Sequence, residues 1–230
     1  MRRGEKGHPK SRVLWYITNV LTSVREFLSG NAMTNSIRRK EITVQQCDNS
    51  EADEIFQEHY WMKRIRRSRK LSYCAFYLGE KVAWIQCADP FGTSLAKPLQ
   101  AFDIGEAIEL CRGYFRDEAP GNIESCTIAN VMRRLPNDWY VKFGVVKKIA
   151  IVYQDLDIGQ KGIVYGAVGF LPYAKAKRAR HHSEAKRGNS KGYKIVWARA
   201  LRPISGQHYK ISMPESPFLK NGKADSIIGS

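Results

Sequence analysis

The residues whose types and positions could carry chemistry gather between Glu109 and Phe170. Arg112 follows three residues of a strand-like run, so its guanidinium would end near a cleft and could bind an anionic donor or a DNA phosphate through two hydrogen bonds. Ser125 falls in the first turn of a helix-like run, where backbone N–H groups favour anions. The alternatives are a surface arginine that pairs with Glu109 or Asp117, and a serine that only caps the helix.

Asp155 also stands where a site is expected. It ends an apolar, β-branched strand, and ligands collect at strand ends in α/β sheets. An Asx-type turn is the alternative. Tyr165 lies on a Gly-bounded segment and precedes a Gly-Phe step by four residues. A core tyrosine with an ordinary hydrogen bond is the alternative there.

The elements that must position these side chains follow in the order strand, helix, strand, short helix. The patterning predicts a strand over 107–115, a loop over 116–122, a helix from Ile123 to Leu135, a strand over 149–153 that ends on Gln154 and Asp155, and a Gly-bounded short helix within 162–170. Upstream it predicts a strand over 41–47, a helix from Glu51 to Tyr60, and strands over 71–78 and 82–87 joined by a turn at 79–81. A closing strand is predicted over 192–199.

These elements predict a mixed α/β domain. The chain divides into a basic N-terminal extension and linker over 1–36, a catalytic domain over 37–202, and a C-terminal coil tail over 203–230. With 230 residues, the chain is long enough for one sizeable core.

The charge is the outlier of the composition. Against 22 acidic residues stand 38 basic ones, which gives a net charge of +16. Such a field favours a polyanionic partner, nucleic acid or an anionic membrane surface, over a basic surface that binds nothing. No stretch reaches the roughly 18 to 20 apolar residues that span a bilayer. Of the two polyanions we expect nucleic acid as the partner, and no membrane.

The five cysteines are odd in number and widely spaced, and no CxxC pair occurs. Neither a zinc ribbon nor a disulfide framework is therefore indicated. We expect reduced thiols in a cytoplasmic protein. No His, Cys and carboxylate cluster in the sequence indicates a metal.

Several stretches over residues 52–172 carry a resemblance when taken together. They are His59-Tyr60, Glu109-Leu110-Cys111-Arg112, Asn122-Ile123-Glu124-Ser125, Tyr153-Gln154-Asp155, and the trio Gly159, Gly162 and Tyr165. Together they resemble the Mom family of phage DNA-modification proteins. The resemblance implies a GNAT-like acyltransferase fold, with a central, mostly antiparallel sheet flanked by helices.

The resemblance also implies a function. Members of the family modify the exocyclic N6 of adenine in DNA with a carbamoylmethyl (acetamido-type) group, which protects the DNA from restriction nucleases. The residues implied for the site are His59, Tyr60, Tyr77, Arg112, Ser125, Asp155 and Tyr165.

Several of these residues have a physical role in such a reaction. Adenine's amino lone pair is delocalised into the ring, so a carboxylate at Asp155 that accepts the amine proton would help the bond to form. In GNAT enzymes, a tyrosine placed like Tyr165 can protonate the leaving thiolate. His59 and Tyr60 could orient a flipped base or relay a proton; a helix-terminal histidine without function is the alternative.

Two basic runs flank the predicted site in the sequence and would supply phosphate contacts. Their residues are Lys63, Arg64, Arg66, Arg67, Arg69 and Lys70, then Lys175, Lys177, Arg178 and Arg180. The alternative is a solvated run without a ligand.

The donor is left open between acetyl-CoA and an aminoacyl-tRNA that carries a glycyl-like unit, which makes tRNA a possible partner. The loop before the central helix reads Arg116-Asp117-Glu118-Ala119-Pro120-Gly121-Asn122, and its two acids would repel the pyrophosphate of CoA. Two other functions also remain open. One is ordinary GNAT N-acetylation of a protein or small-molecule amine, and the other is a non-catalytic nucleic-acid-binding module.

Overall fold

The structure is a computed structural model that describes residues 38–59, 65–155, 162–177, 193–204, 206–208, 210–220 and 223–224. The chain forms two units, residues 1–36 and 37–230, and every described residue belongs to the second. None of the helices in these ranges is long and apolar enough to cross a membrane.

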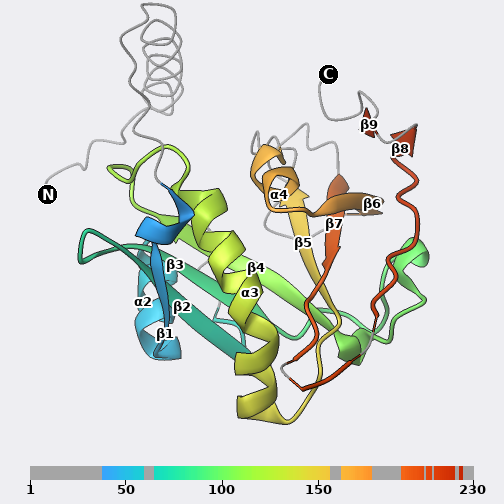
Figure 1. The fold of residues 1–230 in the computed structure, drawn as a ribbon, viewed down its shortest axis with the longest axis horizontal. Coiled ribbons are helices and arrows are strands. Elements are labelled where there is room, and N and C mark those ends of the chain that lie inside the picture. The colour runs from blue at the N-terminus through green and yellow to red at the C-terminus, as the bar shows by residue number, and fades with distance from the viewer. Residues whose placement is uncertain are drawn as a thin grey trace, which may run out of the picture. The chain divides into compact units, whose positions relative to one another are not determined.

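Seven strands form one sheet in the order β1-β2-β3-β4-β5-β7-β6 (Figure 1). Their bounds are β1 (Thr43–Cys47), β2 (Lys70–Tyr77), β3 (Glu80–Ala88), β4 (Ala107–Phe115), β5 (Ile149–Asp155), β6 (Leu171–Lys177) and β7 (Tyr193–Ala200). All neighbouring strands are antiparallel except β4 and β5. A separate hairpin joins β8 (Leu219–Lys220) to β9 (Lys223–Ala224).

In the part of the chain that the structure describes, three α-helices accompany the sheet: α2 (Asn49–His59), α3 (Ile123–Phe143) and α4 (Ile163–Ala167). Short 3-10 turns occupy η1 (Arg39–Glu41), η2 (Lys97–Leu99) and η3 (Ile104–Glu106). The predicted mixed α/β fold with a mostly antiparallel sheet flanked by helices is thus confirmed.

The two faces of the sheet are covered differently. On one face, α3 lies across the strands (Figure 1), and its buried side chains, among them Val131, Leu135 and Trp139, pack in the main core. On the other face, α2 covers the first strands through Ala52 and Phe56. The segment between β3 and β4 covers β5 and β7 with Leu95 and Leu99, among other residues. The candidate site lies on this second face, between the part that α2 covers and the part that the segment between β3 and β4 covers.

The predicted end of the central helix at Leu135 is wrong. The helix continues through Pro136 to Phe143 and stops at Gly144, whose φ of 68° provides the left-handed conformation of a helix C-cap. Proline removes one backbone hydrogen bond, but Pro136 is buried and the apolar face continues through Trp139. Tertiary packing therefore outweighs the local penalty.

A buried lysine, Lys147, holds together the segments that follow β3 and precede β5. The Lys147 ammonium is inaccessible to solvent, and it donates to Asp89 Oδ1 at 2.7 Å, to the Gly105 carbonyl at 2.7 Å and to the Ala107 carbonyl at 2.9 Å. Burial lowers the pKa of Lys147, and the Asp89 carboxylate opposes this shift. The lysine thus ties the segment after β3 and the start of β4 to the segment before β5.

Candidate active site where two strands separate

The parallel strands β4 and β5 pair over a short stretch only. Their register runs from Ala107 opposite Ile149 to Glu109 opposite Ile151 and ends there. Beyond that point β4 continues beside β3, and β5 continues beside β7. The carboxyl halves of the two central strands therefore diverge.

Arg112 and Asp155 lie on the same face of the sheet, the one opposite α3. The Arg112 guanidinium carbon lies 5.8 Å from the ring centroid of Phe56 on α2, which defines its side. On β5, Tyr153 packs in the cluster of the same face, whereas Gln154 accepts a hydrogen bond from Trp197 of the α3-side core. Because strand side chains alternate, Asp155 returns to the face of Tyr153.

Both residues are buried. Arg112 is 7% exposed, so it is not the surface arginine of the alternative interpretation. Its proposed partner Glu109 instead accepts hydrogen bonds from Arg66 at 2.6 Å and from the Phe91 N–H at 3.1 Å. Asp155 is 5% exposed, and its Oδ2 lies 3.7 Å from Nζ of Lys194, its cross-strand neighbour.

His59 and Tyr77 line a shared pocket of about 690 Å³ at the end of β4. The His59 ring stacks on Tyr114, with centroids 4.3 Å apart and planes 7° from parallel. Arg116 also lines the pocket, and its guanidinium lies over the ring of Trp84 at 5.7 Å. Tyr60, predicted beside His59, lies outside the described residues.

Sequence reasoning missed Tyr114 and Arg116. The signal was available, because Arg112, Tyr114 and Arg116 are spaced by two, and alternate residues of a strand project from one face. That spacing predicts that the Tyr114 ring lies beside Arg112 on the same sheet face.

Ser125 and Tyr165 lie on the α3 side of the sheet, opposite Arg112 and Asp155. The Ser125 hydroxyl donates to the Asn122 carbonyl at 3.1 Å, in the first turn of α3. Tyr165 is half-buried on α4 and packs against the α3-side core, with its ring 6.1 Å from that of Trp197. The structure therefore brings Arg112, Asp155 and His59 to one face and places Ser125 and Tyr165 on the other.

The position of Tyr165 depends on Gly162, the residue before α4. Gly162 has a φ of 69°, and a Cβ there would lie 2.6 Å from Trp197 Cζ2 and 2.9 Å from Gln154 Oε1. Those two side chains are joined by the 2.7 Å hydrogen bond from Trp197 Nε1. Glycine is thus required where α4 approaches the end of β5.

We expect Gly162→Ala to lower the free energy of unfolding by about 1–3 kcal/mol, the usual cost of such backbone strain, before the steric overlap is added. Denaturant titration measures the change. Gly166→Ala is the matched control on α4, since its nearest neighbour lies at 4.0 Å. The control should be neutral or stabilising by up to about 1 kcal/mol; equal stability of the two variants would contradict the requirement.

The predicted phosphate-contacting residues are distributed unevenly. Arg66 pairs with Glu109, Arg69 with Asp89, and Lys70 with Asp53, and the side chains of Arg66 and Lys70 are largely covered. Arg67 and Lys175 are exposed. Outside the described residues lie Lys63, Arg64, Arg178, Arg180 and the side chain of Lys177.

A second group of basic residues was not predicted from the sequence. The guanidinium groups of Arg39 and Arg133 donate to the same acceptor, Asn130 Oδ1, at 3.0 and 3.1 Å. Burial, with the nearby charges of Arg133 and Arg202, lowers the pKa of Arg39. Burial, with Arg202 and Arg39, likewise lowers the pKa of Arg199. We call Arg39, Arg133, Arg199 and Arg202 the arginine cluster.

The profile of one protein family, the Mom protein family, matches residues 41–219. The match confirms the resemblance inferred from the sequence. No curated protein sequence matches the chain.

Several solved structures are similar to the chain at low sequence identity. The ribosomal-protein-S5-alanine acetyltransferase from Vibrio fischeri is 11% identical, over 73% of this chain and 99% of its own, with a TM-score of 0.44. A mutant of the SpeG spermidine N-acetyltransferase from Vibrio cholerae is 8% identical, over 70% and 94%, with a TM-score of 0.44. AAC(6')-Ib in complex with ribostamycin and coenzyme A is 10% identical, over 70% and 93%, with a TM-score of 0.47.

Proposed function

This chain belongs to the Mom protein family, and on that premise we propose that it is a transferase that modifies the exocyclic N6 of adenine in DNA. The group added is of carbamoylmethyl or acetamido type, and the modified DNA resists restriction nucleases. The observation that supports this most is the placement of two buried charged side chains, Arg112 and Asp155, on one sheet face where β4 and β5 separate.

The pocket that His59, Tyr77 and Tyr114 line at the end of β4 suits a nucleobase. A base inside a duplex is unreachable, so the enzyme must flip it out or act on single strands. The stacked rings of His59 and Tyr114 offer a flat surface, and stacking on an aromatic side chain contributes about 1–3 kcal/mol per base. A volume of about 690 Å³ accommodates one base and leaves room for a transferred group.

The two faces have different roles in the transfer. The new bond joins N6 of adenine to the carbonyl carbon of the donor, while the bond from that carbon to the donor's sulfur or oxygen breaks. A thioester then leaves an acetyl group on N6, and a glycyl ester leaves a glycyl group, which has the same atoms as a carbamoylmethyl group. Asp155 accepts the proton that the amine loses, and the Tyr165 hydroxyl supplies a proton to the departing sulfur or oxygen.

The donor is a thioester of coenzyme A or an aminoacyl-tRNA. Asp117 and Glu118 are exposed in the loop that precedes α3, where a pyrophosphate would be expected to bind. These carboxylates fit a CoA pyrophosphate poorly, which favours the tRNA ester. Tight binding of CoA without binding of tRNA by the purified protein would reverse that preference.

The arginine cluster supplies phosphate contacts. We expect the double variant Arg133→Ala/Arg202→Ala to bind DNA more weakly, because both residues are exposed and each phosphate contact releases counterions. The slope of log K against log salt should become shallower by up to about 2. Lys210→Ala, which removes another exposed charge, is the control; an unchanged slope in the double variant would remove the cluster from the interface.

Mass spectrometry of nucleosides tests the function itself. DNA from cells that express the wild type should contain a heavier deoxyadenosine that is absent without the protein, and the added mass identifies the donor unit. Unmodified DNA would overturn the proposal. Acetylation of a protein or small-molecule amine, or binding of nucleic acid without catalysis, would then be examined in that order.

A further inference from the structure

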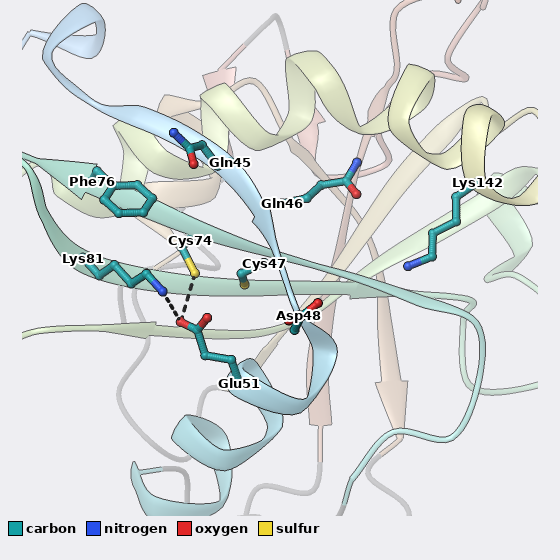
Figure 2. A pocket seen from close by; sticks show the side chains of 9 residues that line it. All are labelled: Gln45, Gln46, Cys47, Asp48, Glu51, Cys74, Phe76, Lys81 and Lys142. Atoms are coloured by element: carbon teal, nitrogen blue, oxygen red, sulfur yellow. Dashed lines mark hydrogen bonds and ion pairs between the residues drawn. The ribbon is translucent and has the colours of Figure 1, made fainter.

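A second pocket, of about 340 Å³, lies at the far end of α2 from His59 (Figure 2). Cys47 ends β1, Cys74 lies on the adjacent strand β2, and Glu51 lies in the first turn of α2. In Figure 2 their side chains converge, and one ligand atom from each lies within 4.8 Å of the other two. We propose that these three residues bind a thiophilic divalent cation of the Zn²⁺ class.

The chemistry of the three side chains fits such a cation. Zinc prefers cysteine sulfur at about 2.3 Å and carboxylate oxygen at about 2.0–2.2 Å, in a tetrahedral arrangement. Those bond lengths put neighbouring ligand atoms roughly 3.4–3.8 Å apart, so the observed spacing needs only a small contraction. Three protein ligands leave a fourth position, which faces a pocket also lined by Gln46 and Asp48.

Glu51 is already held in place for this role. Its Oε1 accepts hydrogen bonds from Lys81 Nζ at 2.7 Å, from Trp84 Nε1 at 2.9 Å and from the Cys74 thiol at 3.5 Å. Among the described residues, every donor to this carboxylate reaches Oε1, which leaves Oε2 for the cation. Partners that orient a ligand in this way are the usual surroundings of a metal site.

The charges balance when a cation is bound. The cation displaces the thiol protons of Cys47 and Cys74, which leave to solvent, and two thiolates with one carboxylate give the divalent site a net charge of −1. The adjacent ammonium of Lys81 neutralises that charge without leaving its 2.7 Å contact. Lys81 is therefore compatible with the cation instead of competing with it.

Titration of the reduced, metal-free full chain with Co²⁺ tests the proposal. The wild type should show thiolate-to-cobalt charge-transfer absorbance and the visible bands of tetrahedral Co²⁺, and Zn²⁺ should abolish both. Cys47→Ser and Glu51→Gln should each weaken binding by more than about 100-fold, beyond the loss usual for a residue that only orients a ligand. Cys111→Ser should bind as the wild type does, because its hydroxyl keeps the hydrogen bond to the Gln86 carbonyl.

Cys74 is buried, and a serine there risks misfolding, so the half-buried Cys47 carries the decisive test. Absence of the charge-transfer band in the reduced wild type would overturn the proposal, as would an unchanged band in Cys47→Ser. If the non-reduced protein then contained a Cys47–Cys74 disulfide, the pair would serve as a covalent link between β1 and β2. The test requires no DNA, so its result is independent of the proposed transferase activity.

Discussion

An Asp155→Asn variant should leave adenine almost unmodified, with the transfer rate reduced by about 10²–10⁴-fold, the usual contribution of a general base. Asparagine matches aspartate in shape but cannot accept the proton that N6 must lose. Asp155 is 5% exposed at the end of β5, so solvent does not readily replace it. The yield of modified deoxyadenosine over time, measured by mass spectrometry, gives the rate.

Asp103→Asn is the matched control for this substitution. Asp103 is exposed at the start of η3, and an asparagine there can still accept the backbone hydrogen bond of its capping box. The control should modify DNA at the wild-type rate. Wild-type activity in Asp155→Asn would show that this carboxylate takes no part in the chemistry. Arg112 would then be the remaining buried candidate on this sheet face, with a role in substrate binding.

A Lys147→Ala variant should lose about 3–5 kcal/mol of unfolding free energy, the usual cost of removing one partner of a buried ion pair. The substitution would leave Asp89 with Arg69 alone, and it would remove the donor to the carbonyls of Gly105 and Ala107. It would also open a cavity beside the buried ring of Trp139, which lies 5.2 Å from the ammonium. Denaturant titration followed by intrinsic fluorescence measures the loss.

Lys148→Ala is the neighbouring control. Lys148 pairs with Glu106, but its side chain is 38% exposed, and exposed pairs contribute about 0–1 kcal/mol. A loss in Lys147→Ala no larger than in Lys148→Ala would show that the buried ammonium is not what joins the loops around β4 and β5. Because Lys147 holds the start of β4 to the segment before β5, activity should fall with stability.

The sequence by itself determined the fold class and the family. Apolar runs with regular spacing predict strands and helices locally, and the order strand, helix, strand, short helix from 107 to 170 reappears in β4, α3, β5 and α4. Polar residues at strand ends, Asp155 above all, could be selected from the same spacing. The secondary-structure predictions succeed because side-chain periodicity is a local property of the backbone, whereas the role of Asp155 stays a prediction.

Only the tertiary structure decided which distant residues meet. Cys47 and Glu51 are close in the sequence, but Cys74 joins them through the pairing of β1 with β2, and no local pattern reports that register. The arginine cluster likewise forms because Arg39 and Arg133, far apart along the chain, share Asn130. Strand register and the packing of helices across a sheet depend on burial summed over the whole chain, so they appear only when the chain is folded.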